Sequence, residues 1–138
     1  MEKLYTAKAT ATGGRNGHVT SIDGALDVDV RTPESLGGPK GKFLNPETMF
    51  AGGYAACFDN ALLSIMGREK IRDVKTSVTA EVSLCKMENG GFNLAITLEV
   101  EINGLDRPAA EALMNKAHSI CPYSNATRGG VDVKVILK

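Results

Sequence analysis

Residues 46–66, near the middle of the chain, carry almost no charge, and this stretch limits what the chain can fold into. Asn45 is a typical N-cap residue and Pro46 suits the first helical position, which predicts a helix start. After the first turn, Asp59 is the only charged residue of the stretch, and the others are mostly small or apolar. A helix without a polar face is buried on most of its sides. We therefore expect a central buried helix over residues 46–66 that stops near Gly67.

Two adjacent glycines, Gly52 and Gly53, lie in the middle of this predicted helix. Each glycine in a helix interior lowers stability by about 1 kcal/mol relative to alanine. Close approach of another backbone at this point would explain why the chain carries them.

The rest of the chain predicts short strands in its first part and longer strands in its second. The dipeptide at 23–24 (Asp-Gly) is a strong hairpin signal, and residues 88–91 separate two long alternating segments. Glycines and prolines make residues 33–42 a loop, and Pro122 ends a second helix. The expected strands cover residues 4–12, 18–22, 25–30, 76–87, 92–102 and 131–137, the second helix runs from Asp106 to His118 or Ser119, and residues 125–130 form a polar loop. This order predicts one α+β domain over residues 1–138 with mostly antiparallel sheets.

The length and charge of the chain argue against several functional classes. With 138 residues, the chain can bury a core without metal or disulfide support. Sixteen Lys and Arg residues balance sixteen Asp and Glu residues, so no basic excess favours binding to nucleic acid or to an anionic membrane. No apolar run approaches the roughly 20 residues of a membrane span, and no signal-peptide pattern is visible.

Three cysteines, an odd number, argue against a secreted disulfide framework. None lies in a Cys-x-x-Cys spacing, so no zinc knuckle is expected. We expect a cytoplasmic location in which the thiols are reduced. Cys57 lies in the middle of the uncharged helix, and Cys121 lies at the end of the second helix. From position alone, each is either a small core residue or a reactive thiol. Cys85 lies on the polar face of a strand and is interpreted as structural.

A reactive thiol on a buried helix needs a compensating cation, because burial raises its pKa and the thiolate is the nucleophile. Arg15 is a candidate, since the glycines of residues 13–17 let the backbone approach another group closely. A solvated turn residue is the alternative interpretation of Arg15. Four other polar residues are interpreted as structural or surface groups: Asp59, His18, His118 and Arg128.

Three segments carry the most specific patterns: residues 12–17, 45–58 and 121–129. They closely resemble motifs of the organic hydroperoxide resistance proteins, which form a superfamily with the osmotically inducible protein C (OsmC) group. The resemblance extends in order and spacing over essentially the whole chain. The run Cys-Pro-Tyr-Ser-Asn-Ala-Thr-Arg in the last segment favours this branch over its sister branch.

The resemblance implies an OsmC-like fold in an intertwined homodimer with active sites at the subunit interface. It implies a thiol peroxidase that reduces organic hydroperoxides, including lipid hydroperoxides, to alcohols. By resemblance, Cys57 is the peroxidatic thiolate and Cys121 is the resolving thiol with which it forms a disulfide. Arg15 would hold the thiolate, and Glu47 would orient Arg15. No metal or organic cofactor is implied, and the external reductant is a dihydrolipoyl dithiol, supplied by dihydrolipoamide or by a lipoylated protein.

Apolar residues near Cys57 suit a lipid-like peroxide better than hydrogen peroxide. Plain core packing is the alternative interpretation of each of them. The predicted pocket residues are Phe43, Met49, Phe50, Tyr54 and Phe58.

The spacing of Glu47 and Cys57 points to a site shared between two chains. They are ten residues apart, so a regular helix separates them by about 15 Å. One arginine cannot easily touch both within one helix. If two copies of the helix cross antiparallel near Gly52 and Gly53, Glu47 of one subunit lies beside Cys57 of the other. We therefore expect each active site to be built from both chains.

Two other classes of function stay open. One is a thiol peroxidase of the sister branch, or one that prefers hydrogen peroxide or peroxynitrite. The other is not an enzyme but a dimeric binding protein for apolar ligands, or a redox sensor whose disulfide serves as a signal. Relative rates with different peroxides, and turnover with a dithiol, separate these classes.

Overall fold

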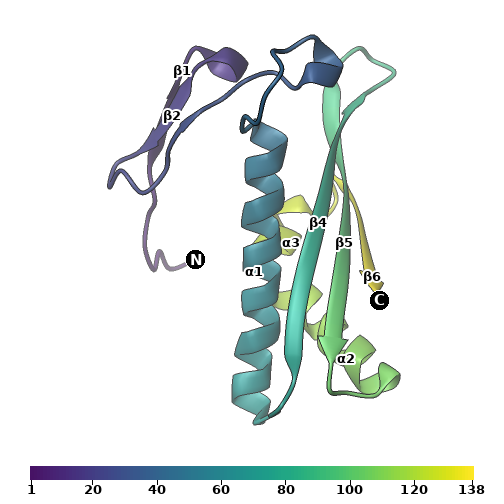
Figure 1. Cartoon of the computed structure of the whole chain (residues 1–138). Coiled ribbons are helices and arrows are strands. Elements are labelled where there is room, and N and C mark those ends of the chain that lie inside the picture. Colours follow the sequence, from purple (N-terminus) through teal and green to yellow (C-terminus); the bar gives the residue numbers. More distant parts are fainter. The chain divides into compact units, whose positions relative to one another are not determined.

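The computed structural model describes residues 1–138 and has the expected α+β composition (Figure 1). Two three-stranded sheets and three α-helices make up most of its regular structure, together with two short 3-10 turns. The backbone gathers into two compact units, residues 1–49 and residues 50–138. Each unit has its own sheet.

A small antiparallel meander forms the first unit: β1 (Ala9–Thr12), β2 (His18–Ser21) and β3 (Asp27–Asp29). A 3-10 turn, η1 (Gly14–Asn16), joins β1 to β2, and a second, η2 (Glu34–Leu36), lies in the predicted loop. β1 is shorter than the sequence predicts, because β2 offers it only four paired residues.

The long helix α1 (Pro46–Glu69) begins at the predicted residue. The Asn45 side chain accepts hydrogen bonds from the backbone N–H of Thr48 at 2.8 Å and from its hydroxyl at 3.0 Å, so it caps the helix as expected. α1 extends beyond the predicted end and includes Gly67. It ends where Lys70 adopts a left-handed backbone conformation with φ of 57°, the conformation in which many helices terminate.

Two long strands of the second unit, β4 (Lys75–Lys86) and β5 (Phe92–Asn103), form the predicted antiparallel hairpin. Helix α2 (Arg107–Ile120) follows and is capped by the side chain of Asp106. The last strand, β6 (Asp132–Leu137), returns beside β5 and pairs with it in parallel. The sheet order is therefore β4-β5-β6, with one antiparallel and one parallel pair.

The segment after Cys121 differs from the prediction. The sequence predicts a helix end before Pro122 and a polar loop over residues 125–130, but the structure contains a further helix, α3 (Pro122–Thr127). Proline is as favourable at the first position of a new helix as it is after the end of an old one. Cys121 therefore caps α2 at one side and α3 at the other.

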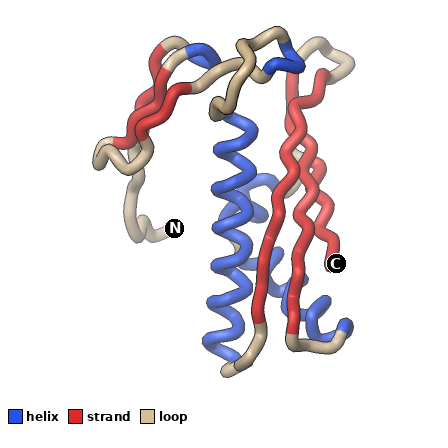
Figure 2. Tube along the Cα trace, in the orientation of Figure 1, coloured by secondary structure: helices blue, strands red, loops and turns tan.

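The core of the second unit lies between the helices and one face of its sheet (Figure 2). Side chains of β5 alternate as the sequence predicts, with Leu98 and Val100 buried and Glu101 exposed. α1 and α2 both contribute to this apolar cluster. The largest fully buried side chains of the unit include Tyr54, Phe58, Leu62, Leu98 and Val100.

In the single chain, α1 is fully buried along one side and half-buried along its flanks, but one further side is exposed, which the sequence did not predict. Leu63 is 50% exposed, and Gly52, Ala56 and Asn60 on the same side are exposed as well. A single chain therefore leaves an uncharged face of the helix uncovered. Neither α1 nor any other helix has both the length and the hydropathy that a membrane crossing requires.

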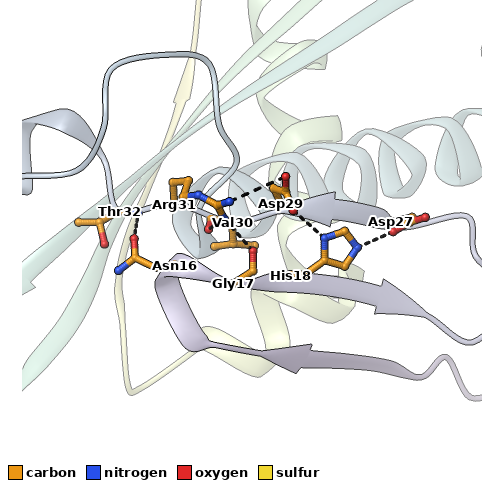
Figure 3. Close-up of polar contacts among 8 residues, drawn as sticks. All are labelled: Asn16, Gly17, His18, Asp27, Asp29, Val30, Arg31 and Thr32. Carbon is orange, nitrogen blue, oxygen red and sulfur yellow. Dashed lines mark hydrogen bonds and ion pairs between the residues drawn. The ribbon is translucent and has the colours of Figure 1, made fainter.

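His18 on β2 is held between two carboxylates of β3 (Figure 3). Its Nδ1 lies 2.8 Å from Asp29 Oδ1, and its Nε2 lies 2.5 Å from Asp27 Oδ1. The hydrogen bonds with Asp29 and then with Asp27 raise the pKa of His18 above its ordinary value. The charged imidazolium is the form that donates from both nitrogens at once.

We predict that the stability of the first unit falls as the pH rises through the pKa of His18. A histidine whose pKa is raised by folding stabilises the folded state fully below its unfolded pKa, and this contribution is lost above its folded pKa. NMR titration should place the pKa of His18 above the ordinary value, whereas burial and then Arg128 lower the pKa of His118. The double variant Asp27→Asn with Asp29→Asn should return the pKa of His18 to the ordinary value. A pKa of His18 at or below that of His118 would contradict this prediction.

Candidate active site

The structure brings two of the three cysteines together. Cys57 lies half-buried in the middle of α1, and Cys121 lies fully buried between α2 and α3. Their Sγ atoms are 3.7 Å apart. Because a disulfide requires about 2.05 Å between its sulfurs, a small movement would join them. The thiol of Cys85 on β4 instead contacts the carbonyl of Ser83 at 3.8 Å.

The surroundings of Cys57 favour the neutral thiol. Burial raises the pKa of Cys57, a hydrogen bond from the backbone of Tyr123 lowers it, and the neighbouring Cys121 thiol raises it again. The net direction is upward, although the thiolate is the form that acts as a nucleophile. A nucleophilic Cys57 would therefore need a nearby cation. No group of three or more His, Cys, Asp or Glu side chains is arranged to hold a metal ion.

Arg15 and Glu47 form a two-pronged ion pair within the first unit. Arg15 Nη1 donates to Glu47 Oε2 at 2.7 Å, and Arg15 Nη2 donates to Glu47 Oε1 at 2.6 Å. The guanidinium lowers the pKa of the Glu47 carboxyl, and the carboxylate raises the pKa of Arg15. Glu47 lies in the first turn of α1, where the helix dipole also favours a negative charge. The four residues with predicted catalytic roles thus form two pairs: Arg15 with Glu47, and Cys57 with Cys121.

Glycines shape the turn that carries Arg15. Gly13 and Gly14 have φ of 76° and 57°, in the left-handed region that other residues rarely adopt. A Cβ on Gly17 would lie 1.7 Å from the carbonyl oxygen of Thr12, so no larger residue fits there. The backbone of this turn therefore does pass close to another group, as predicted, and that group is the end of β1.

A second arginine, Arg31, fastens this turn to the chain that follows β3 (Figure 3). Arg31 Nη1 donates to the carbonyl of Gly17 at 2.9 Å, and the Asn16 side chain accepts from the N–H of Thr32 at 3.3 Å. Asn16 and Gly17, the two residues that directly follow Arg15, are therefore both held by hydrogen bonds. Sequence reasoning missed Arg31, since a basic residue after a short strand gives no local signal of such a contact.

Three aromatic rings, of Phe50, Tyr54 and Tyr123, form a cluster with ring centroids 5.6 to 6.2 Å apart. Tyr123 also covers Gly53, where a Cβ would lie 2.9 Å from the tyrosine hydroxyl oxygen. The close approach expected at the glycine pair thus occurs at Gly53, but the approaching group is a side chain of the same chain. Gly52 faces open space.

The five residues of the predicted substrate pocket differ in their burial. Tyr54 and Phe58 are fully buried in the core, so they offer no surface to a substrate. Phe43 is 44% exposed, and Met49 and Phe50 are half-buried. These three residues are the ones that retain surface for contact with a substrate.

The chain matches a family model and is closely similar to several known proteins. The family model, described as OsmC-like protein, matches residues 39–136. The organic hydroperoxide resistance protein OhrB of Bacillus subtilis (strain 168) is 50% identical over 137 residues, which cover 98% of each chain. The crystal structure of an organic hydroperoxide resistance protein from Elizabethkingia anophelis, with crystallant-derived thiocyanate bound, is 50% identical, has a TM-score of 0.95 and covers 100% of this chain and 99% of that one. A Vibrio cholerae structure with captopril bound in one of its active sites is 42% identical, has a TM-score of 0.93 and covers 99% of this chain and 94% of that one.

We predict that a mild thiol oxidant such as diamide links Cys57 to Cys121 and leaves Cys85 free. The 3.7 Å separation makes this the disulfide that forms with the least movement of the fold. Peptide mass spectrometry locates the bond, and Cys85→Ser should oxidise like the parent chain. A bond that joins Cys85 to either of the other cysteines would contradict the pairing.

Proposed function

The chain belongs to the OsmC-like family and, within it, to the organic hydroperoxide resistance proteins, and we propose that it is a cysteine-based organic hydroperoxide reductase. The family and the OsmC-like α+β fold expected from the sequence are confirmed, and membership supports a role in resistance to organic hydroperoxides. One observation carries the finer proposal, namely the 3.7 Å separation of the Cys57 and Cys121 sulfurs. A peroxidatic thiol needs a resolving thiol within such a reach.

The proposed reaction starts with the Cys57 thiolate. Its sulfur attacks the distal oxygen of the hydroperoxide, so an S–O bond forms, the O–O bond breaks, and the alkoxide takes a proton and leaves as the alcohol. The Cys121 sulfur then attacks the resulting sulfenic acid, the disulfide forms and water leaves. A dihydrolipoyl dithiol reduces this disulfide by thiol exchange and is itself oxidised to the cyclic disulfide. No metal or organic cofactor takes part in this cycle.

Arg15 supplies the positive charge that Cys57 needs in this proposal. A cation beside a thiol stabilises the thiolate and offsets the rise in pKa that burial causes. Glu47 binds both terminal nitrogens of Arg15 and so fixes the direction of the guanidinium plane. The bidentate geometry of the pair supports this division of roles.

We propose that the Arg15–Glu47 pair of one subunit serves Cys57 of the other subunit in a homodimer. Glu47 and Cys57 are ten residues apart in the sequence, and a regular helix separates such residues by about 15 Å. The uncovered face of α1 supports a second copy of the chain, since Gly52 and Ala56 are small, uncharged and exposed there. An isologous crossing at this face would bring opposite halves of the two helices together.

Organic hydroperoxides, including those of lipids, are the proposed substrates. The partly exposed residues Phe43, Met49 and Phe50 suit an alkyl chain. The captopril in the Vibrio cholerae active site is itself a thiol, which supports access of a thiol reductant such as dihydrolipoamide or a lipoylated protein. A cycle of this kind requires a reducing compartment, for which we propose the cytoplasm.

We predict that one equivalent of cumene hydroperoxide converts the reduced protein to the Cys57–Cys121 disulfide, and that dihydrolipoamide restores both thiols. Anaerobic mixing followed by peptide mass spectrometry measures both steps. Turnover should be about tenfold faster, or more, with the organic peroxide than with hydrogen peroxide, because contact with the organic group adds binding energy.

Other results of this experiment would support the alternatives. Oxidation without turnover would indicate a redox sensor, and no oxidation at Cys57 would indicate a binding protein for apolar ligands. A faster reaction with hydrogen peroxide or peroxynitrite would indicate a peroxidase of different specificity.

Arg15→Gln is predicted to raise the pKa of Cys57 and to slow its alkylation at pH 7 by about tenfold or more, because the thiolate loses its cation. The pH profile of the iodoacetamide reaction at Cys57, followed by peptide mass spectrometry, measures this effect. Arg72→Gln is the matched control, since it removes a positive charge from an exposed side chain. Equal profiles for the two variants would exclude Arg15 from the site.

Differently tagged subunits test whether Arg15 acts across the interface. A mixed dimer of one Cys57→Ser subunit and one Arg15→Gln subunit contains an intact site only if the arginine of one subunit serves the thiol of the other. Peroxidase activity in the mixed dimer, well above that of either parent dimer, is the expected result. An inactive mixed dimer would place both groups in the same subunit.

A further inference from the structure

A chain of buried polar side chains connects the helices that carry the two thiols, and none of its members takes part in the proposed reaction. Ser124 Oγ lies 2.9 Å from Tyr54 Oη and 3.0 Å from His118 Nδ1. Thr127 Oγ1 lies 3.4 Å from the Tyr54 hydroxyl and donates to the carbonyl of Tyr123 at 2.8 Å. Tyr54 is 0% exposed and Ser124 is 1% exposed, so bulk water does not compete for the hydrogen bond between them, whereas His118 is half-buried.

Ser124 lies where the elements around the two thiols meet. It follows Cys121 by three residues, and His118 precedes Cys121 by three residues. Tyr54 precedes Cys57 by three residues, which places them on the same side of α1. The Ser124 hydroxyl therefore links the residues on both sides of Cys121 to the turn of α1 that precedes Cys57.

The hydrogen bond between Ser124 and His118 spans the junction between α3 and α2. Cys121 has an extended backbone conformation, with φ of −61° and ψ of 123°, so the chain leaves helical geometry at the thiol itself. A cavity of about 120 Å³ lies beside His118, Ser124 and Thr127, so close packing does not hold α3 on this side. Arg128 adds one more link, because its Nη2 donates to the carbonyl of His118 at 3.1 Å.

The hydrogen bonds of Ser124 form a continuous chain in the tautomer of neutral His118 that carries its proton on Nε2. Burial lowers the pKa of His118, and the charge of Arg128 lowers it further. In that tautomer, Ser124 donates to the lone pair of His118 Nδ1, and Tyr54 donates to Ser124. No buried side-chain nitrogen or oxygen is left without a partner.

We propose that Ser124 is a positioning residue for the resolving step, and that it holds the Cys121 thiol in place so that the disulfide forms before a second hydroperoxide reacts. This inference rests on the proposed function, in which Cys57 becomes a sulfenic acid. Attack of the Cys121 sulfur on that sulfenic acid forms the S–S bond and releases water. Attack of the sulfenic acid on a second hydroperoxide instead adds an oxygen, gives a sulfinic acid and releases a second alcohol. The ratio of these two products reports how well Cys121 is held.

The test compares Ser124→Ala with Ser119→Ala, which removes an exposed hydroxyl near the end of α2. Each reduced protein receives increasing amounts of cumene hydroperoxide, and mass spectrometry quantifies the disulfide and the sulfinic acid at Cys57. Ser124→Ala should raise the ratio of sulfinic acid to disulfide by about tenfold, the factor to which a lost hydrogen bond of about 1.4 kcal/mol corresponds. The rate of the first oxidation of Cys57 should stay unchanged. Ser119→Ala should match the parent chain in both measurements.

Variants of His118 extend the test if Ser124→Ala folds poorly. His118→Asn places an amide oxygen near the position of Nδ1 and so retains an acceptor for Ser124, whereas His118→Ala removes it. Extra sulfinic acid is expected in His118→Ala and not in His118→Asn. A loss of stability alone would not change the product ratio while leaving the first oxidation unaffected.

Two negative results have different meanings. Equal product ratios in the parent chain, Ser124→Ala and His118→Ala would overturn the positioning role of Ser124. Failure of the parent chain itself to form the Cys57–Cys121 disulfide would instead refute the proposed function.

Discussion

Burial of α1 against one face of the β4-β5-β6 sheet is the interaction on which the thiol pair depends. Tyr54, Phe58 and Leu62 recur at every fourth residue, so they form one apolar stripe that packs into the core. Cys57 lies beside this stripe, which leaves its sulfur half-buried and 3.7 Å from that of Cys121. A shift of α1 by one turn, about 5.4 Å, would separate the two sulfurs beyond bonding reach.

The same burial opposes the chemistry that we propose, because it raises the pKa of Cys57. In the proposal, the positive charge of Arg15, which lies outside α1, offsets this rise in pKa. Arg15 lies on a glycine turn whose backbone accepts a hydrogen bond from Arg31. Glu47 accepts hydrogen bonds from two of the N–H groups of Arg15. A guanidinium has five such donors, so the pair leaves others for a thiolate, and a lysine ammonium could not match this two-pronged geometry. Apolar packing thus positions the sulfurs, and a separate polar assembly positions the charge.

Local patterns predict the parts of the structure whose signals are adjacent in the sequence. Asn45 and Pro46 fix the start of α1, whereas its end lies past Gly67 because Lys70 takes up the left-handed conformation. The motifs that carry the family resemblance also identify the cysteines, although their catalytic roles stay predictions. By contrast, the contact of Tyr54 with Ser124 joins residues 70 positions apart, and no local pattern encodes it. An aromatic residue such as Tyr54 can face a substrate or the core, and its identity alone does not distinguish the two.

A polar chain inside an apolar core restricts geometry in a way that packing alone does not. Dispersion contacts have no preferred direction, whereas a hydrogen bond weakens steeply once the angle at its hydrogen falls below about 120°. A buried hydroxyl that loses its partner then destabilises the fold by about 1–3 kcal/mol. Ser124 therefore resists displacement of α3 away from Tyr54 and His118, beside a cavity where packing would permit movement. Cys121 has a backbone free of helical geometry, so it can still cover the remaining distance of about 1.7 Å to bond with Cys57 while the helices on either side stay in place.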